Sequence, residues 1–374
     1  LYNGLSRLFA MAFPIDYAWC VIVMAVLTAI YVIAGGYMAT AINDFIQGVV
    51  MIGGIIAVIV SVINSQGGFS VAINKLSGIS DAAAGIEAGE LSSFFGPDPI
   101  NLLGVVILTS LGTWGLPQMV QKFYAIKNEG AIKKGTVIST IFALIVAGGC
   151  YFLGGFGRLF TPDYAANGSI IYDSIIPNML SNLSPILIGV VIVLVLSASM
   201  STLSSLVLAS SSTLTLDFIK GKIAKNMGEK KQVLIMRILI VVFIAISAVI
   251  AILQHKSNVT FIAQLMGVSW GALAGAFLAP FLYGLYWKKT TKAAVWVNII
   301  FSTVVMLANM LFKSYFPTLL QSPINAGAFC MLIGLVIVPV VSLLTKKPEK
   351  ETVDEIFSCY EKKVTVSSKE SIGE

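Results

Sequence analysis

The chain has 374 residues, of which 57% are hydrophobic and only 11% are charged. A soluble domain of average composition carries about 25% charged residues, so this chain has too few charges to cover a water-facing surface, which excludes a soluble globular protein. The net charge of +6 does not indicate nucleic-acid binding, because the basic residues gather in short connectors between apolar runs, the pattern that sets membrane orientation.

Apolar runs long enough to cross a bilayer recur along the whole chain. A transmembrane helix needs about 20 mostly apolar residues, and the alternation of apolar and polar residues that a membrane β-barrel shows is absent. The sequence therefore predicts an all-α protein embedded in a lipid bilayer. About nine spans are expected, over 17–35, 40–63, 100–120, 136–157, 183–215, 234–253, 258–286, 293–313 and 324–345.

The first two spans are separated only by Gly35, Gly36 and Tyr37. A single helix over both would be about 70 Å long, far beyond the thickness of a bilayer, so the chain is predicted to reverse at the glycines. Asp44, shortly after them, is the only acidic residue well inside any span. Burying its carboxylate costs about 3 kcal/mol on insertion scales. Two interpretations fit its position equally well. The side chain either faces protein, water or a cation inside the membrane, or lies at the membrane surface.

The third span is interrupted by Gly112, Gly115 and Pro117. Such residues free backbone groups that only a cavity or neighbouring protein can satisfy. Broken helices of this kind mark the mid-membrane site of many transporters, although a packing kink is the simpler explanation when this span is taken alone.

The fifth span is unusually rich in hydroxyl groups. In a helix, Ser197, Ser201, Thr202 and Ser205 share one side, with Ala198 one turn below them. Hydroxyls in membrane helices usually bond their own backbone or hold helices together. A cluster of this density also offers the oxygen ligands that a hard cation such as sodium takes. Eleven hydroxyl residues lie here: Ser197, Ser199, Ser201, Thr202, Ser204, Ser205, Ser210, Ser211, Ser212, Thr213 and Thr215.

Span seven carries Gly271 and Gly275, which predict a close helix-packing face, and Gln264 is a weaker indication of a polar lining. The sequence contains no constellation of catalytic base and nucleophile, so a membrane enzyme is not expected. The single histidine, His255, is predicted to be solvated in a short connector.

The basic residues predict the orientation of the chain. Most of them fall in the connectors after spans three, five and seven and in the tail 346–374, which places the C-terminus in the cytoplasm and Leu1 outside. The tail is expected to be partly disordered. The long outer connectors 64–99 and 158–182 are expected to hold short helices.

Three motifs occur in order along the chain: GGYMATAINDFIQ from residue 35, GLPQMVQKFYAIK from residue 115 and SASMSTLSSLVLASSSTLTLDFI from residue 197. In this combination the chain resembles the sodium/solute symporter family over essentially its whole length. The resemblance implies an inverted-repeat (LeuT-like) transporter fold in a domain over 1–345. Residues 17–63 correspond to the end of the first repeat, 100–286 to the second repeat and 293–345 to peripheral helices. The first three core helices are expected to precede Leu1.

The resemblance also implies sodium sites. The family's shared site takes two carbonyls from the first core helix, which is expected to precede Leu1, and a carbonyl and two hydroxyls from the helix that corresponds to span five. Some members hold a second sodium between two further hydroxyls of that helix and an aspartate. The matching groups here are Ala198, Ser201 and Thr202 for the first ion, and Ser204, Ser205 and Asp44 for the second.

For the solute, proline-transporting members carry aromatic residues eight and four positions before the proline of span three. Here these positions are Thr109 and Thr113, and Trp114 is displaced by one, so the chain departs from that pattern. The expected substrate-site residues are Thr109, Thr113, Trp114, Pro117 and Gln264.

The function expected from the resemblance is sodium-driven symport of a small polar or anionic solute, an amino acid or a carboxylate, by alternating access. Sodium is the only metal expected. The alternatives are a transporter-like sensor or signalling module without net transport, and a channel, which sodium currents without solute would reveal.

Overall fold

The computed structural model describes residues 1–360 except 14, 83–84, 124–125, 127, 165–167, 169, 182 and 258–261. Within this part, the side chains of 35–41, 43–44, 121–122, 129, 256–257 and 263 are not described. The described residues contain eight helices long and apolar enough to cross a membrane, and a shorter apolar segment over Pro99–Gly115. This agrees with the nine predicted spans. The chain forms two compact units, one over Leu1–Pro97 and Thr136–Ile262, the other over Asp98–Gly135 and Ala263–Glu374.

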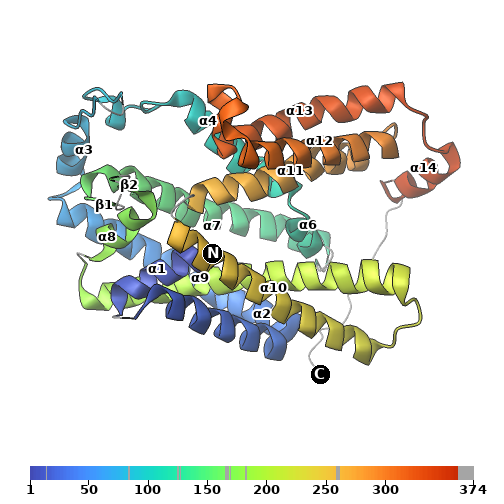
Figure 1. Cartoon of the computed structure of the whole chain (residues 1–374), viewed down its shortest axis with the longest axis horizontal. Helices are drawn as coiled ribbons and strands as arrows, with labels where there is room; N and C mark the ends of the chain where they lie inside the picture. The colour runs from blue at the N-terminus through green and yellow to red at the C-terminus, as the bar shows by residue number, and fades with distance from the viewer. Residues whose placement is uncertain are drawn as a thin grey trace. The chain divides into compact units, whose positions relative to one another are not determined.

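The first unit is built around three long elements that lie side by side, α2, α9 and α10 (Figure 1). The connectors of this unit hold short helices, as predicted. They also hold a two-stranded hairpin, β1 with β2, which was not predicted. The elements are α1 (Tyr2–Ala12), α2 (Tyr17–Ser65), α3 (Phe69–Ser77), most of α7 (Glu129–Gly155), β1 (Asp163–Tyr164), β2 (Ile170–Ile171), α8 (Ile175–Ser181), α9 (Pro185–Ser212), a π-helical extension of α9 (Thr213–Ile223) and α10 (Glu229–Ser257).

The two halves of α2 run in opposite directions along α9. Thr28 Oγ1 lies 3.3 Å from Met200 Sδ, and Gly54 packs against Leu194. Residues 28 and 54 would be about 39 Å apart on a straight helix, whereas residues 194 and 200 are only about 9 Å apart on α9. The chain therefore folds back between residues 28 and 54, as predicted, although the backbone is helical from Tyr17 to Ser65 and no loop separates the two spans at the glycines.

The second unit holds the interrupted helix and the C-terminal spans. In Figure 1 the orange and red α11, α12 and α13 are its long helices. Its elements are α4 (Pro99–Ser110), α5 (Gly112–Gly115), α6 (Pro117–Phe123), α11 (Ile262–Tyr286), α12 (Lys292–Leu311), α13 (Pro323–Leu344) and α14 (Lys350–Phe357).

The break in span three occurs where the sequence predicted it. Leu116 is extended, with φ −84° and ψ 116°, because the ring of the following proline excludes the helical region for the residue before it. Pro117 then begins α6, a position where its missing N–H is tolerated. Gly115 lets α5 approach α11, since a Cβ there would lie 2.8 Å from Ala274 Cα.

The predicted packing face of α11 is also confirmed. A Cβ on Gly271 would lie 2.6 Å from Gly327 Cα, and one on Gly275 would lie 2.9 Å from Cys330 Cβ, so both glycines let α13 pack closely.

Further along α11, Pro280 deprives the Ala276 carbonyl of its helical donor. The side-chain amide of Asn298 on α12 donates to both Gly275 O and Ala276 O at 2.9 Å. The weakened turn before the proline is thus held from a neighbouring helix.

Candidate functional site

The hydroxyl-rich part of α9 has a buried side and a partly open side. Leu203 and Val207 are buried against the core of the first unit. At about 100° per residue, Ala198, Ser201 and Ser205 lie on the opposite side of the helix, where each is only half-buried. Thr202, on the same side, is exposed. Four oxygen-bearing positions are therefore presented together on one face, called here the polar face of α9.

Two oxygens of the polar face lie close enough together to contact the same ion. Thr202 Oγ1 donates a hydrogen bond to Ala198 O at 3.0 Å. A hard cation takes oxygen ligands at about 2.3–2.6 Å, so one ion can contact both oxygens without a change in the helix. Ser201 is a predicted ligand of the first ion and Ser205 of the second, and neither hydroxyl has a hydrogen-bond partner among the described residues.

Ser204 differs from the other predicted ligands. Its side chain is fully buried, and its hydroxyl donates to Ser201 O at 2.9 Å. Asp44, its predicted partner, belongs to α2, but the side chain of Asp44 lies outside the described part of the chain. The structure thus brings together the groups of the first predicted sodium site that lie on α9, and leaves the second prediction as it stood.

The predicted substrate residues belong to the second unit. Thr109 Oγ1 donates to Val105 O at 2.8 Å and Thr113 Oγ1 to Ser110 O at 3.0 Å, so both hydroxyls are bonded to their own helix. Trp114 is 62% exposed on α5. Pro117 begins the next helix, and the half-buried Gln264 lies in the first turn of α11. Among the described contacts, none joins Gln264 to the other four.

Sequence reasoning missed a polar cluster in the first unit. Asn3 Oδ1 accepts from Arg7 Nε at 2.9 Å and from Tyr17 Oη at 3.1 Å. Arg7 also pairs with Asp173, at 3.9 Å between Nε and Oδ2. The Asp173 carboxylate also accepts from the backbone N–H of Ile262, the last residue of the first unit, at 3.2 Å and 3.4 Å. The groups of this cluster come from distant segments, and only the four-residue spacing of Asn3 and Arg7 on one helix could be recognised in the sequence.

The prediction for His255 was wrong. This residue lies in the last turn of α10, because that helix continues to Ser257. Its ring stacks on the Tyr17 ring at 3.8 Å between centroids, and its Nδ1 is buried without a partner among the described residues. Stacking on an aromatic neighbour, not solvation, determines its environment.

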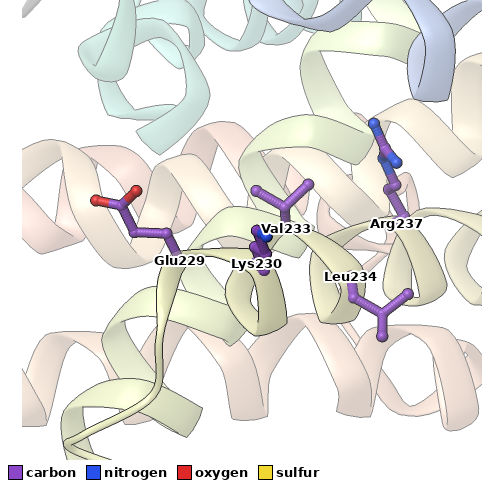
Figure 2. Close-up of a pocket in the computed structure, with 5 residues that line it drawn as sticks. All are labelled: Glu229, Lys230, Val233, Leu234 and Arg237. Carbon is purple, nitrogen blue, oxygen red and sulfur yellow. The ribbon is translucent and has the colours of Figure 1, made fainter.

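One pocket lies at the start of α10. Its lining residues all come from the first turns of this helix, and Figure 2 shows the Glu229 and Arg237 side chains far apart, at opposite ends of the labelled set. Because they do not converge on a common point and include none of the predicted site residues, this pocket carries no functional assignment. The lining residues are Glu229, Lys230, Val233, Leu234 and Arg237.

Comparison with known proteins identifies relatives along most of the chain. A model of the sodium:solute symporter family matches residues 3–312. The sodium/proline symporter of Staphylococcus aureus is 28% identical over 360 residues, which cover 92% of this chain and 65% of the relative. The symporter of the same name from S. aureus strain Newman gives the same values. The chain thus spans about two thirds of the length of these relatives.

A solved structure shares the fold. It is that of a Na⁺-coupled sialic acid symporter in a substrate-bound, outward-open state, with a TM-score of 0.66 and 16% identity, over 93% of this chain and 75% of that one. The chain therefore has a mostly helical, LeuT-like fold.

Proposed function

The chain belongs to the sodium:solute symporter family, a family of transporters, and we propose that the protein imports a small polar or anionic solute by sodium-coupled symport. The protein is a multi-pass membrane protein, with eight candidate spans among the described residues. The observation that supports the proposal is the polar face of α9, where a backbone carbonyl, a bonded hydroxyl and two hydroxyls without a hydrogen-bond partner among the described residues lie together.

In the proposed mechanism, sodium is a transported substrate. The first ion contacts Ala198 O and the hydroxyls of Ser201 and Thr202, and the second contacts Ser204, Ser205 and Asp44. Moving one positive charge inward across 100 mV releases about 2.3 kcal/mol, which corresponds to a concentration ratio of nearly fiftyfold, because about 1.36 kcal/mol is equivalent to a factor of ten. Alternating access couples this energy to the solute.

The solute is proposed to be an amino acid or a carboxylate. The sodium/proline symporters among the relatives support an amino acid, and Thr109, Thr113, Trp114, Pro117 and Gln264 are the proposed contacts. The lysine-rich connectors support a cytoplasmic C-terminus. The proposal is tested by a sodium-gradient uptake screen of amino acids and carboxylates, with the full-length protein in liposomes. Uptake of none of them, or uptake that ignores the sodium gradient, contradicts the proposal.

Ser201→Ala is expected to raise the half-saturating sodium concentration at least tenfold. An interaction between a polar group and a charge contributes about 1.5–3 kcal/mol, and the variant removes one such oxygen. The measurement is solute uptake against sodium concentration, with Ser210→Ala as the control because Ser210 is exposed on the same helix. An unchanged sodium dependence in Ser201→Ala removes the first site assignment.

Ser205→Ala tests the second ion. Two sodium ions per solute are expected for the intact protein, and removing a ligand of one site is expected to lower the ratio toward one. The ratio is measured from the membrane potential at which the solute flux reverses. A ratio of one that Ser205→Ala leaves unchanged counts against a second site.

A further inference from the structure

The start of the polar tail docks on the end of α11. Three contacts make this interface, all within the second unit. Lys288 Nζ pairs with Asp354 Oδ1 at 3.1 Å and lies 5.6 Å from the centre of the Phe357 ring. Tyr360 Oη donates a hydrogen bond to Leu285 O at 2.9 Å.

The contacting residues share one stripe of the tail. Asp354, Phe357 and Tyr360 are spaced by three, which places successive side chains on the same side of a helix. Each meets a group that the end of α11 leaves available. The last carbonyls of a helix lack intrahelical partners, and Tyr360 satisfies that of Leu285. The charge of Lys288 lies just beyond the helix end, where a cation is favourable.

The docked end of α11 follows a weak point in that helix. Pro280 lies five residues before Leu285, and a proline inside a helix removes a hydrogen bond and allows a kink. The turn and a half after Pro280 lacks this hydrogen bond to the preceding turn, and it is held on one side by α13, where Tyr283 Oη donates to Leu335 O at 2.9 Å. The tail contacts that part.

The interface is built for reversible contact. The Lys288 and Asp354 side chains are each 51% exposed, and α14 has no buried residue. An exposed ion pair is weak and is screened by salt, so the docked state is expected to loosen as ionic strength rises.

We propose that residues 350–360 form a reversible latch that, when docked, restrains the end of α11 and slows the transport cycle, and that salt releases it. The docking is independent of the proposed symport, and only the effect on rate rests on it.

Hydrogen–deuterium exchange of the purified full-length protein tests the docking. At about 0.05 M salt, amide exchange in residues 350–357 is expected to be severalfold faster in Asp354→Asn than in the wild type. At about 1 M salt, where screening is nearly complete, the two proteins are expected to exchange at nearly the same rate. Glu355→Gln, one residue along the same helix, is the matched control and is expected to exchange like wild type. The charge swap Lys288→Asp with Asp354→Lys is expected to restore slow exchange. Equal exchange in Asp354→Asn and Glu355→Gln overturns the proposal.

Transport in liposomes tests the restraint. Tyr360→Phe keeps the ring and loses only the hydroxyl, so it is expected to raise the maximal uptake rate and leave the half-saturating sodium concentration unchanged. Faster tail exchange without a change in rate overturns the latch. If wild type shows no sodium-driven uptake, the proposed function fails, and the exchange experiment still decides whether the tail docks.

Discussion

Replacing Gly271 with alanine is expected to destabilise the protein by about 3 kcal/mol, at the upper end of the range for overpacked sites. The added Cβ would lie 2.6 Å from Gly327 Cα and 2.8 Å from Met306 Cε. The methionine end can rotate, but the Gly327 backbone can move only if α13 separates from α11. Helices in a membrane associate by close packing of small residues, so this separation removes the attraction itself.

Gly284→Ala is the matched control for this prediction. Gly284 lies on the same helix, and a Cβ there would meet no atom within 4 Å. Both substitutions improve helix propensity by about 1 kcal/mol, so any difference between them reports the contact with α13. The measurement is thermal unfolding of the purified protein in detergent. Equal unfolding temperatures for the two variants would show that the close approach is not required.

The fold could be predicted largely because a bilayer imposes simple rules on sequence. Hydropathy located the spans, and the glycines and Pro117 predicted the interrupted third span, since both effects act within a few residues. The first helix was missed. Tyr2–Ala12 is too short to span a bilayer, and it is ordered by burying Tyr2, Leu5 and Leu8 against distant elements.

Less of the candidate site could be predicted. The periodicity of a helix placed Ser201, Thr202 and Ser205 on one side of α9, and the structure has them there. Periodicity does not specify hydrogen bonds, so it missed that Ser204 is buried and bonded to Ser201 O. Contacts between distant segments were beyond sequence reasoning, because nothing local to His255 indicates that it stacks on Tyr17.

The pair of Arg7 and Asp173 is the clearest case of a long-range contact, and breaking it is expected to have a large effect. Their side chains are only 15% and 9% exposed. Arg7→Ala leaves the Asp173 carboxylate buried without its cation, which is expected to destabilise the protein by about 3–5 kcal/mol. Arg158→Ala is the control: the side chains of its pair with Asp81 are 44% and 38% exposed, and such a pair contributes at most about 1 kcal/mol.

The pH dependence separates loss of the charge partner from loss of packing by the arginine. Burial raises the pKa of Asp173, while the Ile262 N–H and Arg7 lower it, so Arg7→Ala is expected to raise this pKa further. The folded protein then holds the proton more tightly than the unfolded chain. In this variant, the contribution of the Asp173 carboxyl to stability is therefore greatest below its unfolded pKa of about 3.9 and falls as pH rises through its folded pKa. The gap in unfolding temperature between Arg7→Ala and the double variant Arg7→Ala with Asp173→Asn should shrink as pH falls, because protonation removes the same charge that asparagine removes. A gap that stays constant with pH would mean that Arg7 stabilises the first unit through packing alone.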